Sequence, residues 1–207
     1  RRPPRSTRKE SSAASDVYKR QDPWVDTKVS GNKFIKRFSK AINQTVNDNA
    51  GAKITFPSLF AILQGLLTKS KLISWPRYIS CMIGTLKKQH WSKAIIFDRL
   101  LADVFFSLWK KNKPDFSVLF MNSGAHIQHH YLFNSKAYNG RNNNPDWYVQ
   151  KNQDPLLDIL EMYDDVLYEI ENLGNVRLII AVGLRQVPYE KPDFYWRLKN
   201  HEEFLKK

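Results

Sequence analysis

Hydrophobic residues recur at helical spacing in the first part of the chain. In residues 34–46 the apolar positions that share one helix face are Phe34, Ile35, Phe38, Ala41 and Ile42. This spacing predicts an amphipathic helix. Residues 47–53, NDNAGAK, are rich in turn-forming types and predict its end.

Two further helices are predicted before residue 111. Pro57 predicts the start of the first, because proline suits the opening turn of a helix. Its expected inward face consists of Leu59, Phe60, Ile62, Leu63 and Leu66. Residues 68–93 are basic and irregular, and no regular element is predicted there. Residues 94–110, AIIFDRLLADVFFSLWK, predict a strong amphipathic helix, which ends in lysines that suit the helix dipole.

The pattern then changes to strand-length apolar runs. Residues 115–122 and 176–182 are almost continuously apolar, which is typical of parallel strands covered on both faces. Between them, Asp154 and Pro155 predict the start of a helix that ends at about Leu173, before Gly174. A strand, a helix and a strand in this order form a βαβ unit, which is almost always right-handed.

We therefore predict an α/β fold, a three-layer αβα sandwich with a mainly parallel sheet. In this prediction residues 22–93 are a helical segment, inserted in or capping the domain. Residues 94–207 form part of its α/β core.

The first 21 residues have a different origin in our interpretation. Residues 11–21, SSAASDVYKRQ, match the translation of a sequencing-library transposase adapter, and RRPPRST before them resembles the translated flow-cell primer. We interpret residues 1–21 as adapter-derived and omit them from the fold prediction. We then expect a fragment that begins at about Asp22. The lack of a signal peptide therefore fixes no compartment, and a cytoplasmic location is only slightly favoured.

This interpretation also lowers the charge. The chain carries a net charge of +13, and without the seven basic and two acidic residues of the adapter it keeps +8. The basic residues between positions 69 and 93 are scattered and have no nucleic-acid motif around them, so we expect no nucleic-acid partner.

The single cysteine, Cys81, excludes an internal disulfide and a Cys-rich zinc module. No apolar run reaches the roughly 20 residues of a membrane helix.

Candidate chemistry follows the ends of the two predicted strands, where open parallel sheets bind ligands. The first run ends at Asn122, and His126, His129 and His130 come next; Arg185 follows the second run. His126 and His130 are one helical turn apart and can share a ligand such as zinc. Arg185 can bind an anionic oxygen with two donors. The alternatives are a hydrogen-bonded loop for the histidines and a surface cation or ion-pair partner for Arg185.

Residues 113–131, KPDFSVLFMNSGAHIQHHY, and 178–186, LIIAVGLRQ, resemble the alkaline phosphatase-like superfamily. The likeness is to bacterial members of its type I phosphodiesterase and nucleotide pyrophosphatase branch and is clearest over residues 94–190. It implies a three-layer αβα fold and hydrolysis of a phosphate or sulfate ester at two divalent metals, with a Thr or Ser nucleophile earlier in the chain.

The chain departs from the metal ligands of that branch. His126 matches a ligand histidine, but Asn122 stands where the branch has an Asp. Leu184, Arg185 and Gln186 stand where the branch has Asp-His-Gly. Because these changes remove ligand charge, a two-metal site of the usual form is not expected.

The leading hypothesis is a diverged hydrolase that acts on a small anionic substrate, a phosphate or sulfate ester. It assigns a divalent metal, zinc above all, to Asn122, His126 and His129, and catalytic roles to His130 and Arg185. The alternative is a non-catalytic module that binds an anionic glycan or nucleotide. A basic nucleic-acid binder is the third hypothesis and ranks lowest.

Overall fold

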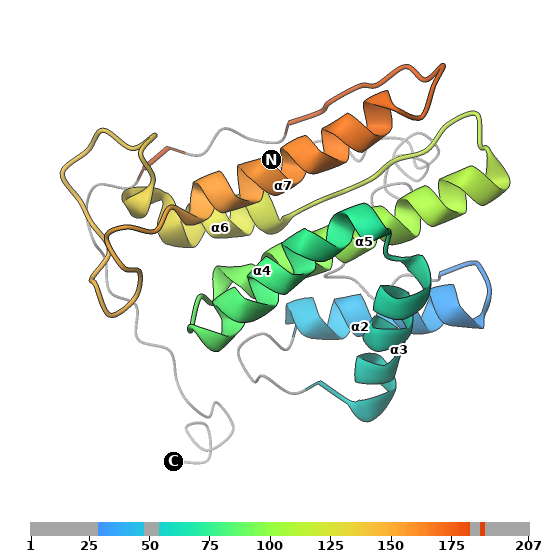
Figure 1. Ribbon diagram of the computed structural model, residues 1–207, viewed down its shortest axis with the longest axis horizontal. Helices are drawn as coiled ribbons and strands as arrows, with labels where there is room; N and C mark the ends of the chain where they lie inside the picture. The colour runs from blue at the N-terminus through green and yellow to red at the C-terminus, as the bar shows by residue number, and fades with distance from the viewer. Residues whose placement is uncertain (1–28, 48–53, 183–186, 189–207) are drawn as a thin grey trace, which may run out of the picture.

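The computed structural model describes residues 29–47, 54–182 and 187–188, which form six α-helices and two short 3-10 helices (Figure 1). In chain order these are α2 (Lys33–Asn47), α3 (Phe56–Lys69), η1 (Leu72–Ser74), α4 (Trp75–Leu86), α5 (Trp91–Asn112), α6 (Ser123–Tyr131), η2 (Leu132–Asn134) and α7 (Pro155–Glu171). The helices predicted over residues 34–46 and 94–110, and those starting near Pro57 and Pro155, are confirmed.

Helix α5 is the centre of the fold, and it contacts α3, α4, α6 and α7. One apolar cluster joins α5 to α2, α3 and α4, with Phe38, Tyr78 and Leu100 at its centre. A second cluster joins α5 to α6 and α7 and contains Phe106 and Ile159. In Figure 1, α6 and α7 lie on one side of α5, and α2 and α3 lie on the other.

The prediction of irregular structure over residues 68–93 is wrong. This stretch contains η1 and α4, and α4 has a proline in its first turn. Tyr78 and Cys81 of α4 are buried against α5. A tertiary contact thus stabilises a helix whose local sequence gives a weak helical signal.

The α/β prediction is also wrong, because the described residues contain no strand. The runs 115–122 and 176–182 lie in neither helix nor strand, and no backbone hydrogen bond between described residues joins them. In the first run Leu119 and Met121 pack against the core, while Phe116 and Phe120 are exposed. The second run is exposed throughout. A continuous apolar run favours burial but does not itself supply the hydrogen-bonding partner that a strand needs.

The inward face predicted for α3 is wrong in most positions. Its buried residues are Ser58, Ala61, Gly65 and Leu66, whereas Leu59, Phe60 and Leu63 are exposed. A methyl group added at Gly65 would lie 3.2 Å from Cε2 of Phe38, so small residues allow α2 and α3 to pack closely. Most of the large apolar side chains of α3 therefore face outward, and Ile62 and Leu66 are the exceptions.

Candidate functional site

The first turn of α6 is held from inside the protein. The backbone N–H of Ser123 donates to Oδ2 of Asp98 at 2.9 Å, and that of Gly124 donates to Oη of Tyr163 at 2.8 Å. The Tyr163 hydroxyl in turn donates to Asp98 Oδ2 at 3.3 Å. A helix N-terminus often binds anions, but here a carboxylate and a phenol of the same chain already accept these donors.

Asp98 is buried, and its pKa is raised to about 6. Loss of hydration raises the pKa, and hydrogen bonds from Ser123, Tyr163 and Asn122 partly offset that effect. Asp98 therefore changes its charge near pH 6. Its role in this structure is to anchor α6 to α5.

His126 and His130 lie one turn apart on α6, and their ring centroids are 4.8 Å apart. The pKa of His126 is lowered by partial burial and by the positive charge that His130 and His129 would add. The pKa of His130 is lowered by partial burial and by His129. Both imidazoles are therefore neutral at pH 7, which is the form that binds metals.

A tyrosine orients the ring of His130. The Tyr148 hydroxyl lies 3.3 Å from Nδ1 of His130, and its ring stacks on Tyr131 with centroids 5.3 Å apart. Contact at Nδ1 leaves Nε2 of His130 as the nitrogen that can bind a ligand or exchange a proton. Tyr148 was not singled out from the sequence, because 18 residues separate it from His130.

The structure brings together only part of the predicted site. Asn122 immediately precedes α6, and its backbone oxygen accepts the N–H of His126 at 3.1 Å. His129 lies on α6 and is exposed. Arg185 falls outside the described residues, so its expected place opposite the histidines stays a prediction. Among the described residues, no three His, Cys, Asp or Glu side chains form a group that could hold a metal ion.

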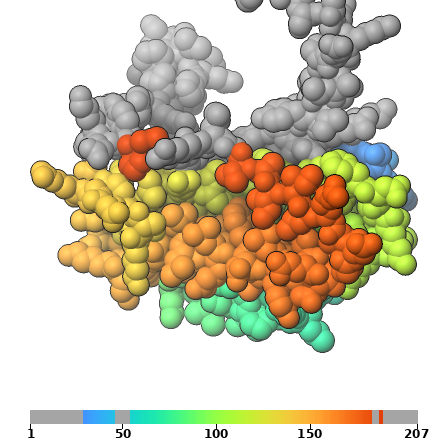
Figure 2. All heavy atoms as spheres, turned by 90° about the horizontal axis from the view of Figure 1, so that it is seen from above, coloured from blue at the N-terminus to red at the C-terminus, as the bar shows by residue number. Residues whose placement is uncertain are grey.

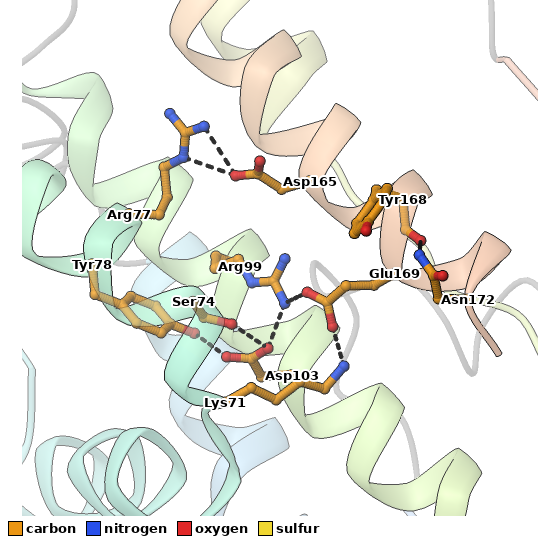
Figure 3. A network of polar contacts seen from close by, with 10 residues as sticks. All are labelled: Lys71, Ser74, Arg77, Tyr78, Arg99, Asp103, Asp165, Tyr168, Glu169 and Asn172. Carbon is orange, nitrogen blue, oxygen red and sulfur yellow. Dashed lines mark hydrogen bonds and ion pairs between the residues drawn. The ribbon is translucent and has the colours of Figure 1, made fainter.

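A second polar group, missed in the sequence, lies between α4, α5 and α7 (Figure 3). Arg99 is 1% exposed and donates to Oδ1 of Asp103 at 2.5 Å and to Glu169 of α7. Asp103 also accepts hydrogen bonds from Ser74 at 2.9 Å and from Tyr78 at 2.8 Å. Glu169 accepts a further bond from Lys71. Through the carboxylates of Asp103 and Glu169, this network thus joins η1, α4, α5 and α7.

A cavity of about 170 Å³ opens beside this network. Its lining includes Arg99, Tyr168 and the carboxylates of Asp164, Asp165 and Glu169. Arg77 pairs with Asp165 at 2.9 Å near the same place. Neighbouring cations thus partly neutralise the carboxylates that line the cavity. We interpret this cluster as a structural ion-pair network.

One feature of the sequence indicates part of this network. Arg99 and Asp103 are four residues apart within an otherwise apolar helix, and that spacing places them side by side. Glu169 lies 70 residues beyond Arg99, and only the packing of α7 on α5 brings the two together.

The chain was also compared with known proteins. No family model matches it, and neither the curated proteins nor the solved structures contain a match. The resemblance to the alkaline phosphatase-like superfamily is therefore untested and stays a prediction.

Proposed function

We propose that this chain is a diverged hydrolase-like protein that binds a phosphate or sulfate ester at the histidines of α6. The observation that carries the proposal is the His126–His130 pair, with both pKa values lowered and the rings 4.8 Å apart. Two neutral imidazoles one helical turn apart form a two-point attachment for a divalent transition metal.

Among the described residues, the histidines of α6 offer two ligands for one metal ion and none for a second. His126 and His130 would hold the ion, and Tyr148 would position the His130 ring. No carboxylate joins them among the described residues, so nothing there bridges a second ion. When bound, such an ion supplies a Lewis acid that polarises an ester oxygen. Open coordination positions would remain for the anionic group of the substrate.

Zinc titration tests the binding step. We expect the full chain to bind Zn²⁺ in isothermal titration calorimetry and His126→Ala to lose about tenfold or more in affinity, about 1.4 kcal/mol. His90→Ala is the matched control, because His90 is exposed and precedes α5, outside the helix that carries the two histidines. Tyr148→Phe should weaken binding about tenfold by releasing the His130 ring. Equal zinc affinity in the parent, His126→Ala and His130→Ala would contradict the proposal.

Hydrolysis is measured separately on 4-nitrophenyl phosphate, bis(4-nitrophenyl) phosphate and 4-nitrophenyl sulfate. We expect zinc-dependent release of nitrophenol that a chelator and His130→Ala abolish.

The second candidate function is binding of an anionic ligand without turnover. It is favoured by the small number of metal-ligating groups at α6 among the described residues. Saturable zinc-dependent binding of phosphate, with no nitrophenol release from any of the three esters, would select this second function.

A further inference from the structure

Large apolar side chains cover the outer face of α3. Phe56, Phe60, Leu63 and Leu67 recur at helical spacing, and all four are exposed. The fraction exposed is 61% for Phe60 and 74% for Leu67. Because the opposite face of α3 packs on α2 and α5, this stripe points away from the core.

The stripe is accompanied by a second one on η1 and α4. Leu72, Ile79, Ile83 and Leu86 are exposed and also follow helical spacing. On α4, Arg77 reaches α7 through Asp165, and the apolar residues lie on the other side of the helix. Figure 2 shows η1 and α4, coloured teal to green, projecting beyond α7 along the lower edge of the view. These two stripes are called the apolar surface below.

The segment that carries the apolar surface is basic. Residues 49–97 contain seven Lys and Arg residues and no Asp or Glu, and two of the seven, Lys71 and Arg77, pair with acidic residues of α7. Lys87 and Lys88 directly follow Leu86 and are exposed, and Lys69 ends α3 next to the first stripe. Residues 1–21 contribute nothing to this count.

We propose that the apolar surface binds an anionic lipid bilayer, with α3 and α4 lying at the interface. Exposed apolar faces with cations at their ends fit the boundary between acyl chains and anionic headgroups. A nucleic acid would use the cations but would leave Phe60 and Leu67 in water. A second copy would bring the same positive charges together. No described helix is long and apolar enough to span a bilayer.

Vesicle co-sedimentation of the full chain tests the proposal. We expect binding to vesicles of equimolar phosphatidylcholine and phosphatidylglycerol, little binding to phosphatidylcholine alone, and partial release by salt. The double variant Phe60→Glu with Leu67→Glu should bind at least about tenfold more weakly, because each change puts a carboxylate against the anionic surface. Leu157→Glu with Leu160→Glu on α7 is the charge-matched control and should bind like the parent.

A second pair of variants tests the contribution of the lysines, with a matched control. Lys87→Gln with Lys88→Gln should weaken binding about tenfold, whereas Lys110→Gln with Lys111→Gln at the end of α5 should have a smaller effect. The first pair is exposed, so the fold is retained, and circular dichroism checks this for every variant.

Three results would overturn the proposal. The first is no binding of the parent chain to the anionic vesicles. The second is equal loss in the α3 and α7 variants, which would indicate attraction by net charge alone. The third is a dimer of the parent chain in analytical ultracentrifugation that the Phe60→Glu and Leu67→Glu changes dissociate, since that would assign the apolar surface to a second copy.

Discussion

Asp98 shows how one residue sets local stability and its pH dependence. It lies on the buried side of α5 and accepts hydrogen bonds from Ser123 and Tyr163, which hold the start of α6. Its pKa near 6 means that burial disfavours the carboxylate even with these donors in place.

Asp98→Asn should therefore remove a pH dependence. The folded chain holds the Asp98 proton up to a pKa of about 6, against an ordinary value of 3.8. The resulting stabilisation is complete below about pH 4 and is lost as the pH rises through about 6, with a total of about 3 kcal/mol. In urea unfolding at a series of pH values, the parent should lose about this much relative to Asp98→Asn. A difference between the two proteins that stays constant with pH would contradict this assignment.

Helix α3 shows where periodicity alone fails at the scale of an element. The pattern predicts the helix correctly but selects the wrong face, because it follows the largest apolar side chains. The observed contact uses Ser58, Ala61 and Gly65, whose small size permits close approach to α2. Which face of this helix is buried was decided by fit against Phe38, and that residue belongs to another helix.

Two substitutions on α3 distinguish the predicted buried face of this helix from the observed one. Phe60→Ala should cost under about 1 kcal/mol, because its side chain is exposed; a buried phenylalanine would cost about 3–5 kcal/mol. Ala61→Leu should cost about 1–3 kcal/mol by overpacking the buried face of α3. Chemical denaturation of both variants measures the costs. The reverse order would restore the inward face predicted from the sequence.

At the scale of the whole molecule, the buried ion pairs connect helices that are distant in the sequence. Arg99 and Asp103 of α5 bind Glu169 of α7, Ser74 of η1 and Tyr78 of α4. The partly buried Arg77 pairs with the half-exposed Glu161 and Asp165 of α7 at 3.1 and 2.9 Å. Both groups of polar contacts connect α4 with α7, but they differ in exposure to water. This difference determines how much each group contributes to the free energy of unfolding.

Arg99→Met should therefore destabilise the fold far more than Arg77→Met. Removing Arg99 leaves the buried carboxylate of Asp103 without a counter-charge, at a cost of about 3–5 kcal/mol. Removing Arg77 breaks ion pairs whose acidic partners are half-exposed, and this should cost about 1 kcal/mol or less. The two midpoints of denaturation, measured at the same pH, give the comparison. Equal shifts would show that burial does not set the strength of these pairs.

The sequence by itself determined the position of four helices, the cap at Asp154 and the spacing that pairs His126 with His130. These features depend on residues within a few positions of one another, so local pattern is sufficient. Tertiary structure decided the rest: the burial face of α3, the formation of α4, and the lack of pairing between residues 115–122 and 176–182. Each of these depends on a partner from elsewhere in the chain, whose shape and hydrogen-bonding groups an isolated segment does not encode.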